Sequence, residues 1–137
     1  MATNTTATTA RQFPAQMVHY LRRRIAYNTT FISTDDYTLV GTLPAGSIIL
    51  QSVVKVEIAF DAGTTNYINV GIVGDDDGIV DQDDIDLTAA EWQSSMRGCD
   101  LTFASDTNVY VTYDQSGTAA QAGVAVVIVA YIPDNDS

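Results

Sequence analysis

Apolar residues recur at every second position over much of the chain. In the stretch 47–60, one set of alternate positions is apolar and the set between them is polar or small. The apolar positions are Val54, Val56, Ile58 and Phe60, and the others are Lys55, Glu57 and Ala59. Because successive side chains of a β-strand point to opposite faces, this alternation predicts a long strand with one buried face. We predict further strands over 17–27, 36–40, 65–73, 101–104, 107–114 and 123–132.

The segments nearest the two ends of this pattern carry additional information. The segment 124–131 is almost continuously apolar, which is typical of a strand covered on both faces or of one whose outer face meets a second subunit. The segment 17–27 also fits a short helix, because Pro14 is followed by apolar residues at Met17, Leu21 and Ile25. We favour the strand because β-forming residues continue it directly.

Turn residues separate the predicted strands. Leu43-Pro44-Ala45-Gly46 has a proline that fixes its own φ and a glycine that supplies the positive φ of a reversal. One short helix is predicted over 87–96, where Glu91 follows Thr88 at the spacing of a capping box. About seven short strands with such turns predict an all-β, single-domain β-sandwich of the jelly-roll type.

The order of polar and apolar segments also divides the chain. Residues 1–16 form a predicted extended arm, because its first twelve residues are rich in Thr and Ala and show no hydrophobic period. The β-sandwich domain is predicted over 17–133, and 134–137 form a short acidic tail. A chain of this length buries about two-thirds of its unfolded surface. The single cysteine, Cys99, excludes an internal disulfide.

The charge of the chain excludes two classes of partner. Seventeen acidic and six basic residues give a formal charge of −11, which repels nucleic acids and anionic membranes. The sequence has neither the order of a signal peptide nor an apolar run of the ~20 residues that span a bilayer. We therefore expect synthesis in a cytoplasm, and no nucleic-acid or membrane partner.

An acidic segment, 73–85, gathers six aspartates around Gly78. When the segment is aligned with the twelve-residue calcium-binding loop of an EF-hand, the candidate ligands at the third, fifth, ninth and twelfth positions are Asp75, Asp77, Asp81 and Asp84. The first position is Val73, and the last is an Asp where a bidentate Glu is usual. Two interpretations stay open. The segment either binds calcium or is a solvated connection that Ile79, Val80 and Ile85 attach to the core.

Arg22, Arg23 and Arg24 are the basic cluster of an acidic chain. On a strand, Arg22 and Arg24 share one face, and they either pair with carboxylates of another protein or offset the chain's own acidic surface. The lone His19 has no nominated partner for metal ligation or for activating a nucleophile. The sequence thus predicts no enzyme and no cofactor, apart from the calcium interpretation.

Four segments together resemble the decoration or cement proteins of tailed-bacteriophage capsids. They are an Arg-rich strand ending in Ala-Tyr-Asn (22–28), Gly-Thr-Leu-Pro-Ala-Gly (41–46), Ala-Phe-x-Ala-Gly-Thr-Thr-Asn (59–66) and Val-Tyr-x-x-Tyr-x-Gln-x-Gly-Thr-Ala-Ala (109–120). The resemblance implies a jelly-roll subunit, a homotrimer, and attachment to the outer surface of the virion where major capsid subunits meet. It implies capsid contacts at Arg11, Phe13, Arg22, Arg23 and Arg24.

Two further functions stay open. The first is a head-fibre or tail adhesin module that binds host carbohydrate through Trp92 or the tyrosines, since aromatic rings stack on the apolar faces of sugars. The second is a hydrolase using an acidic pair such as Asp83 and Asp86, although both lie outside any predicted buried framework that would separate two carboxyl pKa values.

Overall fold

The computed structural model describes residues 18–29 and 38–134. Within these residues, eight antiparallel strands form two four-stranded sheets. The strands are β1 (His19–Ala26), β2 (Thr38–Leu43), β3 (Ile48–Ile58), β4 (Thr65–Ile72), β5 (Asp75–Val80), β6 (Trp92–Ser95), β7 (Thr107–Ser116) and β8 (Val124–Ile132). The predicted arm, 1–16, and residues 135–137 of the predicted tail lie outside the described residues.

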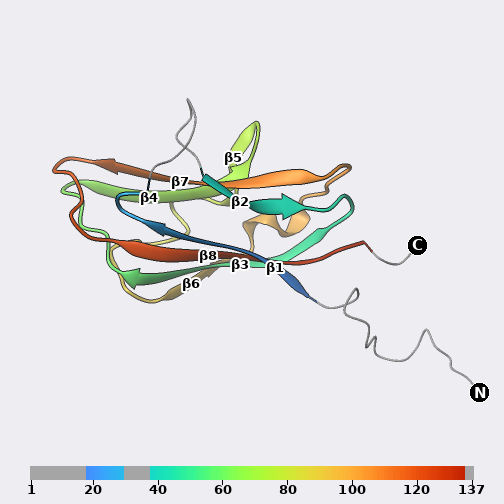
Figure 1. Ribbon diagram of the computed structural model, residues 1–137, viewed down its shortest axis with the longest axis horizontal. Coiled ribbons are helices and arrows are strands. Elements are labelled where there is room, and N and C mark those ends of the chain that lie inside the picture. Colours follow the sequence, from blue (N-terminus) through green and yellow to red (C-terminus); the bar gives the residue numbers. More distant parts are fainter. Residues whose placement is uncertain (1–17, 30–37, 135–137) are drawn as a thin grey trace, which may run out of the picture.

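The strand orders are β1-β8-β3-β6 in one sheet and β2-β7-β4-β5 in the other. The two sheets lie face to face as two layers (Figure 1). Apart from the hairpin of β4 and β5, each strand lies in the opposite sheet from the strand before it. Eight strands in this interleaved order make the double-sheet jelly roll, so the predicted fold class is confirmed.

The core lies between the sheets and consists of the alternate residues that each strand turns inward. Its fully buried members include Leu43, Val54, Ile68, Val70, Val109, Val111, Val127 and Val129. A bulge interrupts the pairing of β3 with β8 between Val56 and Ile58. The bulge shifts the alternation by one residue, so Ile58 is 51% exposed and its predicted place beside Val54 and Val56 is wrong.

The predicted helix over 87–96 is also wrong. The Asp86 carboxylate accepts hydrogen bonds from the backbone N–H and the hydroxyl of Thr88, but the turn that they stabilise does not continue as a helix. The Gln93 side chain bonds both the N–H and the carbonyl of Asp86, and β6 then pairs with β3. In the described residues, the helical element of this region is the 3-10 turn η3 (Arg97–Asp100).

Two more boundaries differ from the sequence prediction. Part of the acidic segment is the strand β5, because Ile79 and Val80 pack into the core while Asp75 and Asp76 remain exposed at the sheet edge. Residues 101–104 form no strand. Phe103 is buried there, and its carbonyl accepts a hydrogen bond from the backbone N–H of Gly46. Gly46 lies in the predicted turn and has the positive φ, +82°, that the turn requires.

Hydrogen bonds between the connections β3–β4 and β7–β8 close one end of the sandwich. The Asn66 side chain bonds the N–H and carbonyl of Ala62 and accepts a bond from the Tyr113 hydroxyl at 2.7 Å. The Asp61 carboxylate accepts the N–H groups of Gln121 and Ala122, which lowers the pKa of Asp61. These bonds fix the two connections against each other.

Among the described residues, no helix has the length and apolar character needed to cross a membrane.

Candidate functional site

Strand β1 determines where the arginine cluster lies. It is an edge strand that pairs with β8, and Arg24 lies opposite Val126 while Arg22 lies opposite Ile128. Arg23 lies opposite Val127, whose side chain is buried in the core. Because side chains alternate along a strand, Arg22 and Arg24 point to the outer face of the sheet and Arg23 to its other side. All three arginines are exposed.

The pairing of β8, β3 and β6 extends this outer face into cross-strand rows. One row runs Arg24, Val126, Lys55 and Trp92, and the next runs Arg22, Ile128, Val53 and Ser94. A third contains Tyr20, Ala130 and Gln51. We call these eleven residues the basic sheet face.

The centre of the basic sheet face is apolar and its flanks are cationic. Val126 points outward but is only 4% exposed, and we attribute this burial to the aliphatic stems of Arg24 and Lys55 on either side of it. The Lys55 ammonium lies 5.2 Å from the centre of the Trp92 ring, which places it in cation–π contact. The cations are thus held beside the apolar strip of β8.

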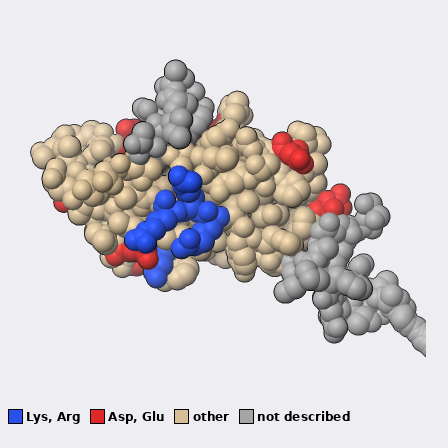
Figure 2. All heavy atoms as spheres, in the orientation of Figure 1, with Lys and Arg blue, Asp and Glu red and all other residues tan. Residues whose placement is uncertain are grey.

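The face contrasts in charge with the rest of the molecule. Three of the six basic residues of the chain, Arg22, Arg24 and Lys55, lie on this face, and Arg23 lies on the same edge strand but points to the other side of the sheet. In Figure 2 basic side chains lie together over strand β1. Arg24 contacts Glu57 at 3.4 Å, an exposed and therefore weak ion pair. Arg22, Arg23 and Lys55 make no ion pair with any residue that the structure describes.

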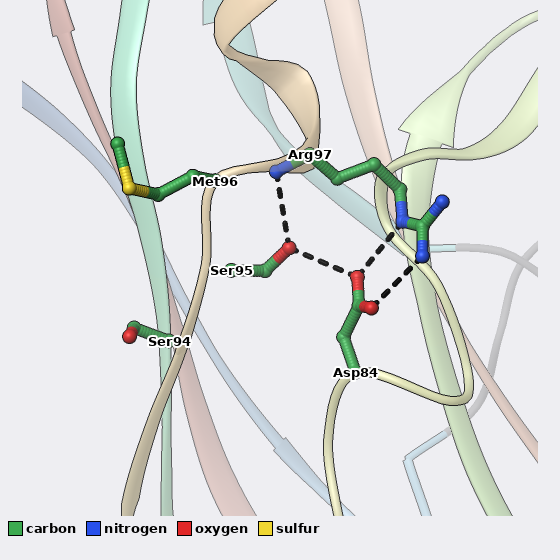
Figure 3. A pocket seen from close by; sticks show the side chains of 5 residues that line it. All are labelled: Asp84, Ser94, Ser95, Met96 and Arg97. Atoms are coloured by element: carbon green, nitrogen blue, oxygen red, sulfur yellow. Dashed lines mark hydrogen bonds and ion pairs between the residues drawn. The ribbon is translucent and has the colours of Figure 1, made fainter.

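The predicted calcium ligands occupy a different part of the fold. Asp75 and Asp77 lie on β5, and Asp81 and Asp84 lie in the connection from β5 to β6. The Arg97 guanidinium binds both carboxylate oxygens of Asp84, each at 2.9 Å (Figure 3). Asp84 also accepts bonds from the Ser95 hydroxyl and the N–H of Asp81. The Arg97 guanidinium holds the pKa of Asp84 well below its usual range.

This arrangement uses Asp84 as a structural anion. In residues 18–29 and 38–134, no three acidic, histidine or cysteine side chains gather closely enough to hold a metal ion. The four aspartates thus do not form a ligand set in this structure, and calcium binding stays a prediction. The nearby hollow of about 410 Å³ is lined by Asp84, Ser94, Ser95, Met96 and Arg97, several of which are already bonded to one another.

The two candidate reactive side chains have structural surroundings. The Cys99 thiol lies 3.0 Å from the carbonyl oxygen of Leu50 and donates to it. The His19 ring lies 5.8 Å from the ring of Tyr131, its neighbour on β8. Neither contact supplies a base for a nucleophile. Arg11 and Phe13 lie outside the described residues.

Sequence reasoning identified the arginines and named Trp92 and the tyrosines as candidate sugar-binding residues, but it did not bring them together with Lys55 and the apolar residues of β8 on one face. Lys55 was expected on the polar face of its strand, and this is confirmed. Its position two strands away from Arg24 depends on the order of strands in the sheet, which the sequence did not predict. Trp92 was assigned to a helix and lies instead on β6, where it is 63% exposed. The outward-facing apolar side chains of β8 were the one available signal, and they lie at the centre of this face.

Comparison with known proteins identifies the fold. No family model matches the sequence, and no curated protein matches it. A chain of the cyanophage Pam1 capsid asymmetric unit matches with a TM-score of 0.64 and 20% identity, over 95% of this chain and 97% of that one. A chain of the acidic stable capsid structure of Helicobacter pylori bacteriophage KHP30 gives a TM-score of 0.58 at 17% identity, over 83% and 86%. A chain from the capsid of Ralstonia phage GP4 gives a TM-score of 0.52 at 15% identity, over 88% of this chain and 86% of that one.

Proposed function

We propose that this chain is a structural protein of a tailed-phage virion that binds the outer surface of the capsid, bridges neighbouring major capsid subunits and stabilises the shell. The observation that carries the proposal is the match of most of this chain to chains of three phage capsid structures, in one case over 95% of this chain and 97% of the other. The sequence motifs that resemble decoration proteins point the same way.

The described surface suits a binding role better than a catalytic one. It presents a basic sheet face with an apolar centre, and its buried polar groups mainly serve the fold. A homotrimer placed where capsid subunits meet would engage several of them at once, so that weak individual contacts multiply through avidity. The arm, 1–16, with Arg11 and Phe13, would add strand-to-sheet or groove contacts. The chain would be made in the host cytoplasm and have no nucleic-acid or membrane partner.

One observation favours a second candidate. Trp92 and Tyr20 are 63% and 65% exposed and lie on the same sheet face. Exposed aromatic rings on a rigid sheet can stack on the apolar faces of sugars. A head-fibre or tail adhesin module that binds host carbohydrate would use them in this way.

The copy number of the chain in purified particles of its source separates the two. Quantitative mass spectrometry against the major capsid protein should give near-stoichiometric amounts for a capsid-binding protein. A few copies per particle would assign the chain to a fibre or adhesin. Its absence from particles that contain every known shell component would refute a virion role.

A further inference from the structure

We infer that the basic sheet face docks onto a protein surface that carries carboxylates around an apolar centre. The inference rests on the proposed function, under which that surface belongs to the major capsid protein. It adds to the arginine cluster the residues Val53, Lys55, Val126 and Ile128, which come from the two central strands of the sheet.

The first argument is charge. A chain with a formal charge of −11 places three of its six cations, Arg22, Arg24 and Lys55, on one sheet face. Arg22, Arg23 and Lys55 have no acidic partner among the described residues, so offsetting the chain's own acidity accounts only for Arg24. Unpaired cations on an acidic protein attract a carboxylate-bearing partner and set its orientation, while like-charged surfaces are repelled.

The second argument is the apolar strip between the cations. On the outer face of β8, Ile128 and Ala130 lie at alternate positions and are partly exposed, with the partly exposed Val53 beside Ile128, whereas Val126 is already buried. The second sheet packs against the inner side of this sheet, so no strand that the structure describes covers the outer face (Figure 1). Burying apolar side chains is the main source of binding free energy in a protein interface, whereas a phosphate backbone offers no apolar match.

The third argument is spacing. Arg24 and Lys55 lie on either side of Val126, one strand away in each direction, so their strands are about 10 Å apart. Arg22 lies two residues along β1 from Arg24, or about 7 Å. The complementary surface therefore has carboxylates about 10 Å apart, and beside them an apolar side chain that meets Ile128 and Val53 in the next row. Arginine guanidinium groups can bind such carboxylates in the bidentate manner.

The fourth argument is that the face is ordered before it binds. The Lys55 ammonium is in cation–π contact with the Trp92 ring, whereas the exposed ion pair between Arg24 and Glu57 adds little. Side chains that are held in place before binding lose less conformational entropy in the complex.

The test compares two variants of the full-length chain with the same change in net charge. Arg22→Gln with Lys55→Gln removes two cations from the face. Thr102→Glu with Ser105→Glu adds two carboxylates in the exposed connection before β7, at residues that belong to none of the cross-strand rows of the face. Binding is measured by co-sedimentation with source shells stripped of this protein, and circular dichroism and the thermal midpoint establish that each variant is folded. Arg22→Glu, at an exposed edge position, serves as a single-site variant.

We expect the Gln variant to bind shells at least tenfold more weakly than the unchanged chain, the control variant to bind within about threefold, and salt between about 0.1 and 0.5 M to weaken the unchanged chain. If the unchanged chain binds and the Gln variant binds equally well, the inference is overturned while the proposed function stands. If the unchanged chain does not bind shells, the proposed function itself fails. The same pair of proteins is also tested on DNA and on phosphatidylserine vesicles. If the unchanged chain binds one of these and the Gln variant does not, while both bind shells equally, the face belongs to another class of partner.

Discussion

At the scale of single residues, Asp84 links three segments. Its carboxylate accepts bonds from the backbone of Asp81, from the Ser95 hydroxyl on β6, and from the guanidinium of Arg97 on η3. The carbonyl oxygen of Ile79, in the same acidic segment, also lies within hydrogen-bond distance of the Ser95 hydroxyl. Asp84, which the sequence marks as a candidate metal ligand, is thus paired with the guanidinium of Arg97 in the structure.

We expect Asp84→Asn to lower the thermal midpoint at pH 7 by about 3–6 °C, because the charged acceptor of Arg97 and Ser95 is lost. The pKa of Asp84 is lower in the folded chain than its ordinary value of 3.8. Its contribution to stability is therefore complete above that pH and is lost as the pH falls below it. Thermal melts from pH 7 to pH 2 should show a smaller acid loss in the variant.

Asp83→Asn is the matched control for this change. Asp83 is exposed and adjacent in sequence, and its hydrogen bond to Asp81 is made by its backbone N–H. The control should melt within about 1 °C of the unchanged chain, since exposed substitutions away from bonded groups have small effects. Equal losses for the two variants would mean that Asp84 has no special structural role.

At the scale of elements, the connections at the closed end of the sandwich behave as one unit. Replacing Asn66 with Ala removes the bonds to both backbone groups of Ala62 and leaves the Tyr113 hydroxyl without its acceptor. We expect a loss of about 2–3 kcal/mol in the free energy of unfolding, measured by urea denaturation.

Tyr113→Phe removes only one of these bonds and should cost about 1 kcal/mol. Burial, together with the charges of Asp61 and Asp114, raises the pKa of Tyr113 to about 12. The neutral phenol therefore contributes stability that is present below its ordinary pKa of 10.0 and lost toward pH 12. An alkaline titration of stability should show this loss in the unchanged chain and a smaller one in Tyr113→Phe; identical alkaline curves would contradict this account.

Strands with strong alternation or continuous apolar character could be predicted from the sequence, and short or acidic strands could not. The predicted strand 65–73 becomes β4 at Thr65–Ile72, and 123–132 becomes β8 at Val124–Ile132. The strand β5 begins with three aspartates, which are poor strand formers, and forms because its last two residues enter the core. The strand β6 has four residues, too few to show a period. Whether β5 and β6 form strands is decided by pairing with their neighbours, β4 and β3 respectively.

The same limit applies to the candidate surface. The alternation of β1 was enough to place Arg22 and Arg24 on one face. Their juxtaposition with Lys55 requires β8 to insert between β1 and β3, and this long-range order has no local signature. The sequence therefore contained the arginines and the apolar strip as separate observations, and the sheet topology joined them.

At the scale of the whole molecule, the arm and the domain are predicted to have separate tasks. Removing residues 1–12 should weaken binding to stripped shells by tenfold or more and leave the thermal midpoint of the domain within about 1 °C, because the core formed by the described residues begins at Leu21. The measurements are co-sedimentation and a thermal melt. Unchanged shell affinity would refute the role of the arm, and a lower midpoint would show that the arm belongs to the fold.

The strand order also determines when this protein can fold during its synthesis. The two strands made last, β7 and β8, lie in the interior of the sheets: β7 between β2 and β4, and β8 between β1 and β3. Until the ribosome has released residues 124–132, neither β1 nor β3 has the neighbour that completes its sheet. Pairings between such distant segments form slowly and leave apolar edges exposed meanwhile. A ribosome stalled before β8 would therefore carry a chain whose first sheet lacks the strand between β1 and β3.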